Sequence, residues 1–167
     1  PEHSIRIYQA LKQRGVPTMV FMHQGGHGGP PPMKLMNRWF TRYLHGFENG
    51  VEDDSRAWIV REDAKRTEPT AYEDYPHPEA RDVTLHLTAG APQTGALVID
   101  HPARQPCETL VDNYSFDGVA LARAEWTNHR LIYLTPTLTE TIHISGTPRL
   151  TIRLASSKEA VNLSVWL

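Results

Sequence analysis

Two histidines, His23 and His27, lie four residues apart in a segment that otherwise holds glutamine and glycine. Imidazole changes its charge near neutral pH, so a constrained histidine can act as a general acid and base or as a metal ligand. The glycines around His27 occupy positions 25, 26, 28 and 29. Glycine lets the backbone turn through positive φ and approach other groups closely. His27 is therefore the first candidate for chemistry in this chain.

A metal site is the first alternative, because the spacing of His23 and His27 is that of zinc ligands on one face of a helix. The residues between them, Gln24, Gly25 and Gly26, do not favour a helix, and no glutamate follows His23. No third ligand stands nearby, so we expect no metal and no cofactor. A structural role, in which His27 caps the following helix or fills the loop, stays open.

The elements that must position His27 are a strand before it and a helix after it. Residues 19–22 form a short apolar run, which is typical of a buried parallel strand, and we expect that strand at residues 18–22. Residues 4–14 before that run have the apolar spacing of a helix face, and Gly15 suits the end of that helix. Pro32 suits the start of a second helix, whose apolar stripe runs to Phe47 and predicts a core-facing side. Open α/β sheets place their chemistry at the carboxyl ends of such strands.

The second half of the chain has a different pattern. Residues 56–61 predict one more strand, and the proline-rich residues 62–81 predict an extended connector, so we place a domain boundary near residue 80. Beyond it the apolar residues alternate, and short strands with Gly, Pro and Ser breaks predict a β-sandwich or jelly roll. These strands are expected at residues 83–88, 130–134, 141–146, 149–154 and 161–167. Both ends of the chain look cut, so we expect a piece of a longer protein with further strands to follow.

Composition excludes several classes of partner. The formal net charge of the 167 residues is −2, which does not favour nucleic acid or an anionic membrane surface. No apolar run approaches the ~20 residues that cross a bilayer. Cys107 is the lone cysteine, which excludes an intrachain disulfide and favours a reducing compartment. We expect a cytoplasmic protein, with secretion left open, and we do not expect Cys107, in its polar proline-flanked segment, to be a nucleophile.

Two clusters of segments resemble one known family. The first holds Met22–His27, with Pro1–Ser4 before it and Arg38–Gly46 after it, and the second holds Leu131–Leu138 and Ile144–Pro148. Together they resemble the X-prolyl dipeptidyl aminopeptidase family of α/β-hydrolase serine peptidases, which is related to cocaine esterase and the α-amino-acid ester hydrolases. In α/β-hydrolases the catalytic histidine follows the last parallel strand, and the triad order is Ser, acid, His.

The resemblance implies a fold and an activity. The fold class would be α/β plus β: residues 1–80 would be the C-terminal part of an α/β-hydrolase catalytic domain, and residues 81–167 the first part of a jelly-roll β-sandwich. His27 matches the catalytic histidine of a Ser-Asp-His triad, whose serine and aspartate lie upstream of this chain. The whole enzyme would release N-terminal Xaa-Pro dipeptides from peptides with a penultimate proline, and a homodimer is left open.

None of the serines of this chain stands in a G-x-S-x-G setting, so none substitutes for the missing nucleophile. They lie at positions 4, 55, 115, 145, 156, 157 and 164. The chain alone is therefore expected to be inactive.

Two alternatives remain at this point. One is an esterase or acylase of the same family, because the substrate pocket is not in view. The other is a non-catalytic β-sandwich binding module, whose sugar platforms would be Tyr114, Trp126 and Trp166. We expect each of these aromatic residues to pack in the core or at an edge instead. The strand, glycine loop and helix ahead of the sandwich have no role in such a module and so favour the hydrolase.

Overall fold

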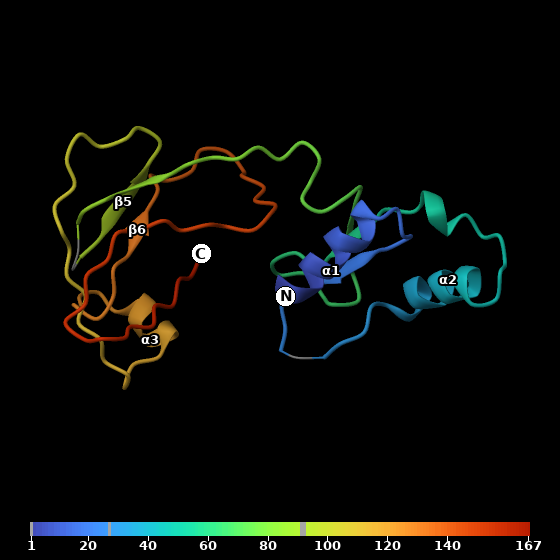
Figure 1. The fold of residues 1–167 in the computed structure, drawn as a ribbon, viewed down its shortest axis with the longest axis horizontal. Coiled ribbons are helices and arrows are strands. Elements are labelled where there is room, and N and C mark those ends of the chain that lie inside the picture. The colour runs from blue at the N-terminus through green and yellow to red at the C-terminus, as the bar shows by residue number, and fades with distance from the viewer. Residues whose placement is uncertain (1, 27, 91–92) are drawn as a thin grey trace. The chain divides into compact units, whose positions relative to one another are not determined.

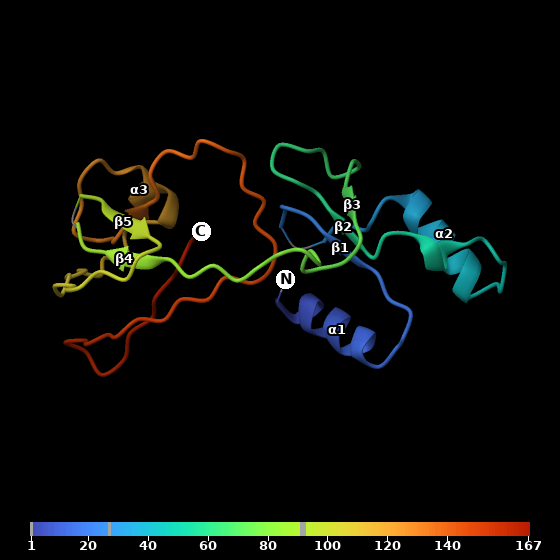
Figure 2. The same cartoon turned by 90° about the horizontal axis from the view of Figure 1, so that it is seen from above.

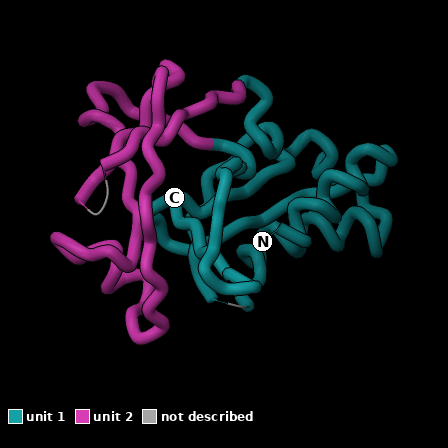
Figure 3. Tube along the Cα trace, turned by 60° about the vertical axis from the view of Figure 1, so that its left-hand side comes forward, with its two compact units in different colours: residues 1–80, 145–167 teal, residues 81–144 magenta. Residues whose placement is uncertain are grey.

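The computed structural model divides the chain into two compact units. It describes residues 2–26, 28–90 and 93–167. The first unit combines residues 1–80 with residues 145–167, and the second holds residues 81–144 (Figure 3). Each unit contains one three-stranded sheet of mixed strand direction.

The sheet of the first unit has the strand order β1-β2-β3. Its strands are β1 (Val20–Met22), β2 (Ala57–Ile59) and β3 (Thr70–Tyr72). Strand β1 runs parallel to β2, and β2 runs antiparallel to β3. A parallel pair needs a long crossover, and here helix α2 (Met33–Tyr43) lies in that connection. Strands β1 and β2 confirm the predicted strands within 18–22 and 56–61, whereas β3 lies in the segment predicted to be a connector.

Helix α1 (Glu2–Gln13) covers this sheet and supplies the centre of a small core. Tyr8 on α1 is only 2 % exposed and packs with Val20, Ala57 and Tyr75. Figure 2 shows α1 alongside the three strands. A buried tyrosine contributes a large apolar surface but needs a partner for its hydroxyl group. The Tyr8 hydroxyl group has one, because it donates a 2.6 Å hydrogen bond to Asp74 Oδ1.

Helix α2 differs from its prediction. It begins after Pro32, as expected, but ends at Tyr43, and the structure buries none of its side chains. Met33 is 65 % exposed and Phe40 45 % exposed. The apolar stripe of α2 was predicted to face a core. Within the first unit it does not pack in a core, because α2 contacts mainly the short 3-10 helix η1 (Val51–Asp53).

Polar contacts hold α2 to η1. Arg38 makes a two-pronged ion pair with Asp54, and Arg42 pairs with Glu52. Asn49 joins the two elements through its side chain, which donates a 2.8 Å hydrogen bond to the carbonyl of Arg38 and accepts one of 3.2 Å from the N–H of Val51. Beside these contacts the Val51 side chain is almost fully buried.

The second unit is built on the order β4-β5-β6. Strand β4 (His86–Thr88) runs antiparallel to β5 (Gly95–Val98), which runs parallel to β6 (Tyr133–Leu134) (Figure 1). The helix α3 (Gly118–Arg123) begins at Asp117, whose side chain accepts a hydrogen bond from the third residue beyond it. The sequence pattern predicted β4 and β6 but neither β5 nor α3.

Two half-buried charged side chains, Arg130 and Glu108, tie the loops of this unit together. The Arg130 guanidinium donates to the carbonyl oxygens of Leu121, Ala124 and Gln93, which fixes the segment around α3. Glu108 accepts hydrogen bonds from the Tyr133 hydroxyl group at 2.5 Å and from the N–H of Gly90 at 2.8 Å. Burial, together with the Glu108 carboxylate, raises the pKa of Tyr133 above its ordinary value.

The predicted strands within 141–146, 149–154 and 161–167 are absent. Among the described residues no strand follows Leu134. The alternating apolar side chains of these segments are exposed, as Ile144 and Val165 illustrate. An extended segment becomes a strand only when a neighbouring strand pairs with its backbone, and alternation alone does not supply that neighbour.

None of the helices in the described part of the chain has the length and apolar character that a membrane crossing requires.

Candidate functional site

The candidate site starts at the edge of the first sheet where β1 and β2 both end. Because the two strands are parallel, their carboxyl ends meet at one edge. The N–H of Val60 donates a 2.9 Å hydrogen bond to the carbonyl of Met22, which extends the pairing to the last residue of β1. The loops that follow the two strands, residues 23–32 and 60–69, therefore leave the sheet side by side. This is the edge where we expected chemistry.

His23 lies at the start of the first loop, and its imidazole ring lies against the glycine backbone. The side chain is half-buried, with its ring centre 5.7 Å from that of Phe21. A Cβ atom built on Gly25 would lie 2.9 Å from His23 Nδ1, and one built on Gly29 would lie 3.2 Å from His23 Nε2. Both ring nitrogens thus face the loop that contains them, between these two glycines.

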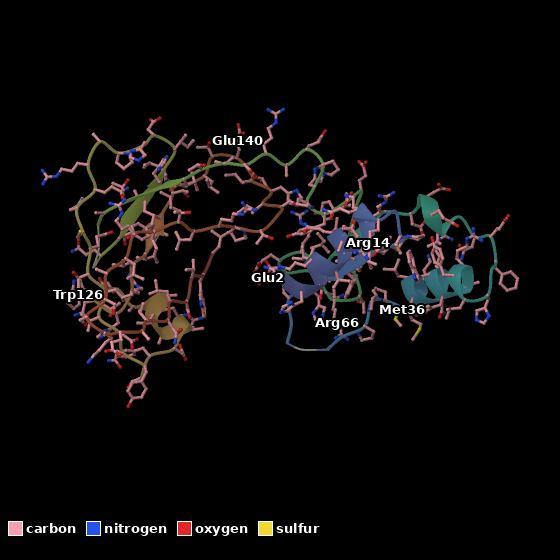
Figure 4. All side chains as sticks on the ribbon, in the orientation of Figure 1. Glu2, Arg14, Met36, Arg66, Trp126 and Glu140 are labelled. Atoms are coloured by element: carbon pink, nitrogen blue, oxygen red, sulfur yellow. The ribbon has the colours of Figure 1, made fainter. Side chains whose placement is uncertain are left out.

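The second loop contacts the first one with two charged side chains. Gln24 Nε2 donates a 3.3 Å hydrogen bond to Glu62 Oε2. The Arg66 guanidinium lies so close to Gly29 that a Cβ atom at that position would overlap Nη1. Figure 4 labels Arg66 beside the segment that leads from β1 to α2. Gly29 has φ of +128°, so its backbone conformation favours glycine.

His27, the predicted catalytic residue, lies outside the described residues. Its role stays a prediction. The residues on both sides are described, and Gly28 has a positive φ of 92°. As to a metal site, no group of three His, Cys, Asp or Glu side chains within residues 2–26, 28–90 and 93–167 is placed to hold an ion.

Other reactive side chains take structural or exposed positions. Cys107 is exposed. The Ser145 hydroxyl oxygen accepts a 2.8 Å hydrogen bond from the N–H of His77, and the Ser156 hydroxyl oxygen accepts one of 3.0 Å from the N–H of Lys158. Ser145 thus joins two segments of the first unit that lie far apart in sequence, and Ser156 stabilises a local turn.

The three aromatic residues considered as sugar platforms do not pack in a core. Tyr114 is 96 % exposed, Trp126 is 62 % exposed and Trp166 is 66 % exposed. The prediction of core or edge packing was therefore wrong for them. Each lies in a segment without regular secondary structure.

An open pocket of about 400 Å³ lies elsewhere on the first unit. Its lining is mostly acidic and consists of Glu52, Asp53, Asp54, Ser55, Arg56, Glu73 and Asp74. The carboxylates of Glu52, Asp54 and Asp74 are each paired with an arginine or a lysine. These ion pairs give the three carboxylates a role in holding the fold together.

Sequence reasoning missed Glu62 and Arg66, because both fall in the segment interpreted as a connector. A signal for them was available in the two predicted strands. If residues 18–22 and 56–61 pair in parallel, the loops after them must lie next to each other. The charged residues directly after the second strand are then neighbours of the glycine loop.

With this geometry in place, comparison with known proteins gives the family. Residues 49–167 match the family described as the X-Pro dipeptidyl-peptidase C-terminal non-catalytic domain. The chain belongs to this family. The match confirms the resemblance seen in the sequence. It begins after α2, so the glycine loop precedes the matched region, whereas Glu62 and Arg66 lie within it.

Whole-chain relatives carry the corresponding enzyme name. A Rhodopirellula baltica protein named "Putative Xaa-Pro dipeptidyl-peptidase" is 62% identical over 167 residues, which is 100% of this chain and 27% of that protein. A Bacillus anthracis protein of the same name is 27% identical over 174 residues, covering 96% of this chain and 27% of its own length. The Xaa-Pro dipeptidyl-peptidase of Lacticaseibacillus rhamnosus is 25% identical over 176 residues, 100% of this chain and 22% of its own.

The chain thus spans about a quarter of the length of the relatives it matches. No solved structure matches it.

Proposed function

We propose that this chain works as the C-terminal part of a serine-type Xaa-Pro dipeptidyl-peptidase. The observation that carries the proposal is the 62% identity to a protein of that name across all 167 residues, which include the glycine loop ahead of the non-catalytic domain. Residues 1–80 would then complete an α/β-hydrolase domain, and residues 81–167 would begin a jelly-roll sandwich. The cytoplasmic location and the homodimer stay predictions.

His27 is the general base and acid in this proposal. It removes the proton from the hydroxyl group of a serine that lies outside this chain, and the serine attacks the carbonyl carbon of the substrate's proline residue. The imidazolium then gives the proton to the leaving amine, and the cycle repeats with water to release the Xaa-Pro dipeptide. An aspartate, also outside the chain, orients the ring. A glycine loop at the end of a parallel strand suits such a histidine, because strand pairing anchors its base.

The substrate is a peptide with an unblocked N-terminus and proline in second place. This part of the proposal rests on the names of the relatives, since the pocket for the dipeptide lies outside the chain. An esterase or acylase would use the same histidine on a different acyl group. The first experiment must therefore separate the two substrate classes.

The test uses a full-length enzyme that contains this chain, a chromogenic Gly-Pro anilide, a simple aryl ester and the variant His27→Ala. We expect the wild type to cleave the anilide, and we expect His27→Ala to lose at least about 10⁴-fold in kcat, as for removal of a triad histidine elsewhere. His45→Ala is the matched control, because His45 is exposed beyond the end of α2.

Each other outcome corrects the proposal in a defined way. Cleavage of the ester alone, lost in His27→Ala, would keep the histidine but assign an esterase. Activity that survives in His27→Ala would remove His27 from the triad and favour a non-catalytic role for the glycine loop.

A further inference from the structure

We infer that His23 and Arg66 are positioning residues, which hold the glycine loop so that His27 stands where catalysis needs it. The His23 imidazole lies close to Gly25 and Gly29, and the Arg66 guanidinium lies close to Gly29. The inference rests on the proposed function, because the position of the loop affects catalysis only if His27 is the triad histidine.

The first step of the argument is that His23 is firmly anchored. It follows Met22 directly, and the carbonyl of Met22 is bonded to the N–H of Val60 on the neighbouring strand. The half-buried ring also packs against the ring of Phe21. A ring held at its base by a strand and at its side by an aromatic neighbour cannot swing away freely.

The second step is that this ring limits what the loop can do. A Cβ atom on Gly25 would lie 2.9 Å from Nδ1 and 3.2 Å from Cε1 of His23, and one on Gly29 would lie 3.2 Å from Nε2. Gly25 and Gly29 therefore both lie near contact distance of the ring. A run of glycines has a high conformational entropy on its own, and a rigid ring against the loop reduces the space that the backbone can explore.

The third step concerns Arg66, which comes from the region matched to the non-catalytic domain. Arg66 lies in a turn in which the N–H of Glu68 donates a 2.8 Å hydrogen bond to the carbonyl of Lys65. The turn before it is closed by a 3.0 Å hydrogen bond from the N–H of Ala64 to the carbonyl of Arg61. The Arg66 guanidinium packs on Gly29, and Glu62 accepts the hydrogen bond from Gln24. A segment of the non-catalytic family region thus contacts the loop at Gln24 and Gly29.

The consequence for catalysis follows from the precision that proton transfer demands. A general base must be held within about 0.5 Å of its productive position, and a displacement of about 1 Å can cost roughly 100-fold in rate. Neither His23 nor Arg66 needs to touch the substrate for this effect. Both act through the loop that they hold.

Two alanine variants of adjacent glycines test the inference in the full-length enzyme. In Gly25→Ala the new methyl group meets the His23 ring, whereas in Gly26→Ala it meets no atom within 4 Å and the backbone φ is not positive. We expect Gly25→Ala to lower kcat on the Gly-Pro anilide by about 10- to 100-fold with KM nearly unchanged, and Gly26→Ala to stay within about 2-fold of wild type.

A double-mutant cycle identifies His23 as the partner. His23→Ala should lower kcat by a similar factor, and adding Gly25→Ala to it should cause little further loss, because the colliding ring is gone. The acid limb of the profile of kcat/KM against pH should shift in His23→Ala and Gly25→Ala, and not in Gly26→Ala. A loss of folded protein alone would not move that limb.

Arg66→Ala tests the contact from the second loop. We expect a smaller loss in kcat, up to about 10-fold, because the guanidinium contacts the loop at one glycine only. Arg61→Ala is its matched control, since the Arg61 side chain is exposed and lies in the same loop, at the start of the preceding turn. Equal activity of the two arginine variants would remove Arg66 from the inference.

The outcomes keep the inference and the proposed function apart. The proposed function stands if wild type is active and His27→Ala is not. The inference is then wrong if Gly25→Ala is as active as Gly26→Ala, or if the effects of Gly25→Ala and His23→Ala on kcat add fully. If His27→Ala remains active, the proposed function fails first. If Gly25→Ala does not fold, the variants His23→Ala and His23→Gln test the inference instead. Full activity of both variants overturns the inference. A loss of kcat in His23→Ala that is smaller in His23→Gln supports it.

Discussion

At the scale of single residues, Asp74 shows how this small fold is held together. Its carboxylate accepts hydrogen bonds from the Tyr8 hydroxyl group and the N–H of Tyr75, and it pairs with Lys12. Burial works against the charged form, but these donors outweigh it and hold the pKa of Asp74 below its ordinary value. Burial and the nearby Asp74 carboxylate also raise the pKa of Tyr8. The pair therefore fastens α1 to the segment after β3.

This contact predicts an acid-dependent loss of stability. Because the pKa of Asp74 is lower in the folded than in the unfolded chain, its contribution is present above the unfolded value near 3.8 and is lost as pH falls through the folded value. We expect Asp74→Asn to cost about 2 kcal/mol at neutral pH, as for hydrogen bonds to a charged group. Urea unfolding at a series of pH values should show the difference from wild type shrinking below about pH 4.

Asp82→Asn is the control for this experiment, because Asp82 is exposed. A difference between wild type and Asp74→Asn that stays constant down to pH 2 would show that the charge of Asp74 does not matter.

At the scale of elements, α2 illustrates why a pattern can predict a helix and still misjudge its surroundings. The helix exists because its residues have helical spacing after a proline, which is a local property. What its apolar stripe packs against depends on the rest of the fold. Within the first unit α2 is held to η1 by side-chain contacts instead, and Asn49 makes two of them.

We expect Asn49→Ala to lower the free energy of unfolding by about 1–2 kcal/mol, because it removes one donor and one acceptor from partly buried partners. Asn49→Asp keeps the acceptor and should fall between alanine and wild type. Urea unfolding measures both, with Asn37→Ala on the exposed side of α2 as the control. No difference between the variants at positions 49 and 37 would mean that α2 is not fastened by Asn49.

At the scale of the whole molecule, the chain supplies one proposed member of a triad and a region of the non-catalytic family. In the first unit, Glu62 and Arg66 of that region contact Gln24 and Gly29 in the loop after β1. In the proposed enzyme, side chains of the non-catalytic region therefore contact a loop of the catalytic part.

The 167-residue chain on its own should show no hydrolysis of the Gly-Pro anilide or the aryl ester, because none of its serines stands in a nucleophile elbow. The assay compares the purified chain with buffer, and His27→Ala serves as the control for contaminating activity. Turnover by the chain that disappears in His27→Ala would show that a nucleophile lies within it.

Local patterns were enough to predict α1, β1, the start of α2, β2, β4 and β6, since helix spacing, short apolar runs and proline or glycine at element ends depend on neighbours in sequence. They were also enough to single out the glycine loop and to recognise the family. The exposed segments after Leu134 and the contacts of Glu62 and Arg66 with that loop were decided only by the tertiary structure. Strand pairing and loop contacts join residues far apart in the chain, and no local pattern records which distant segment comes to lie beside another.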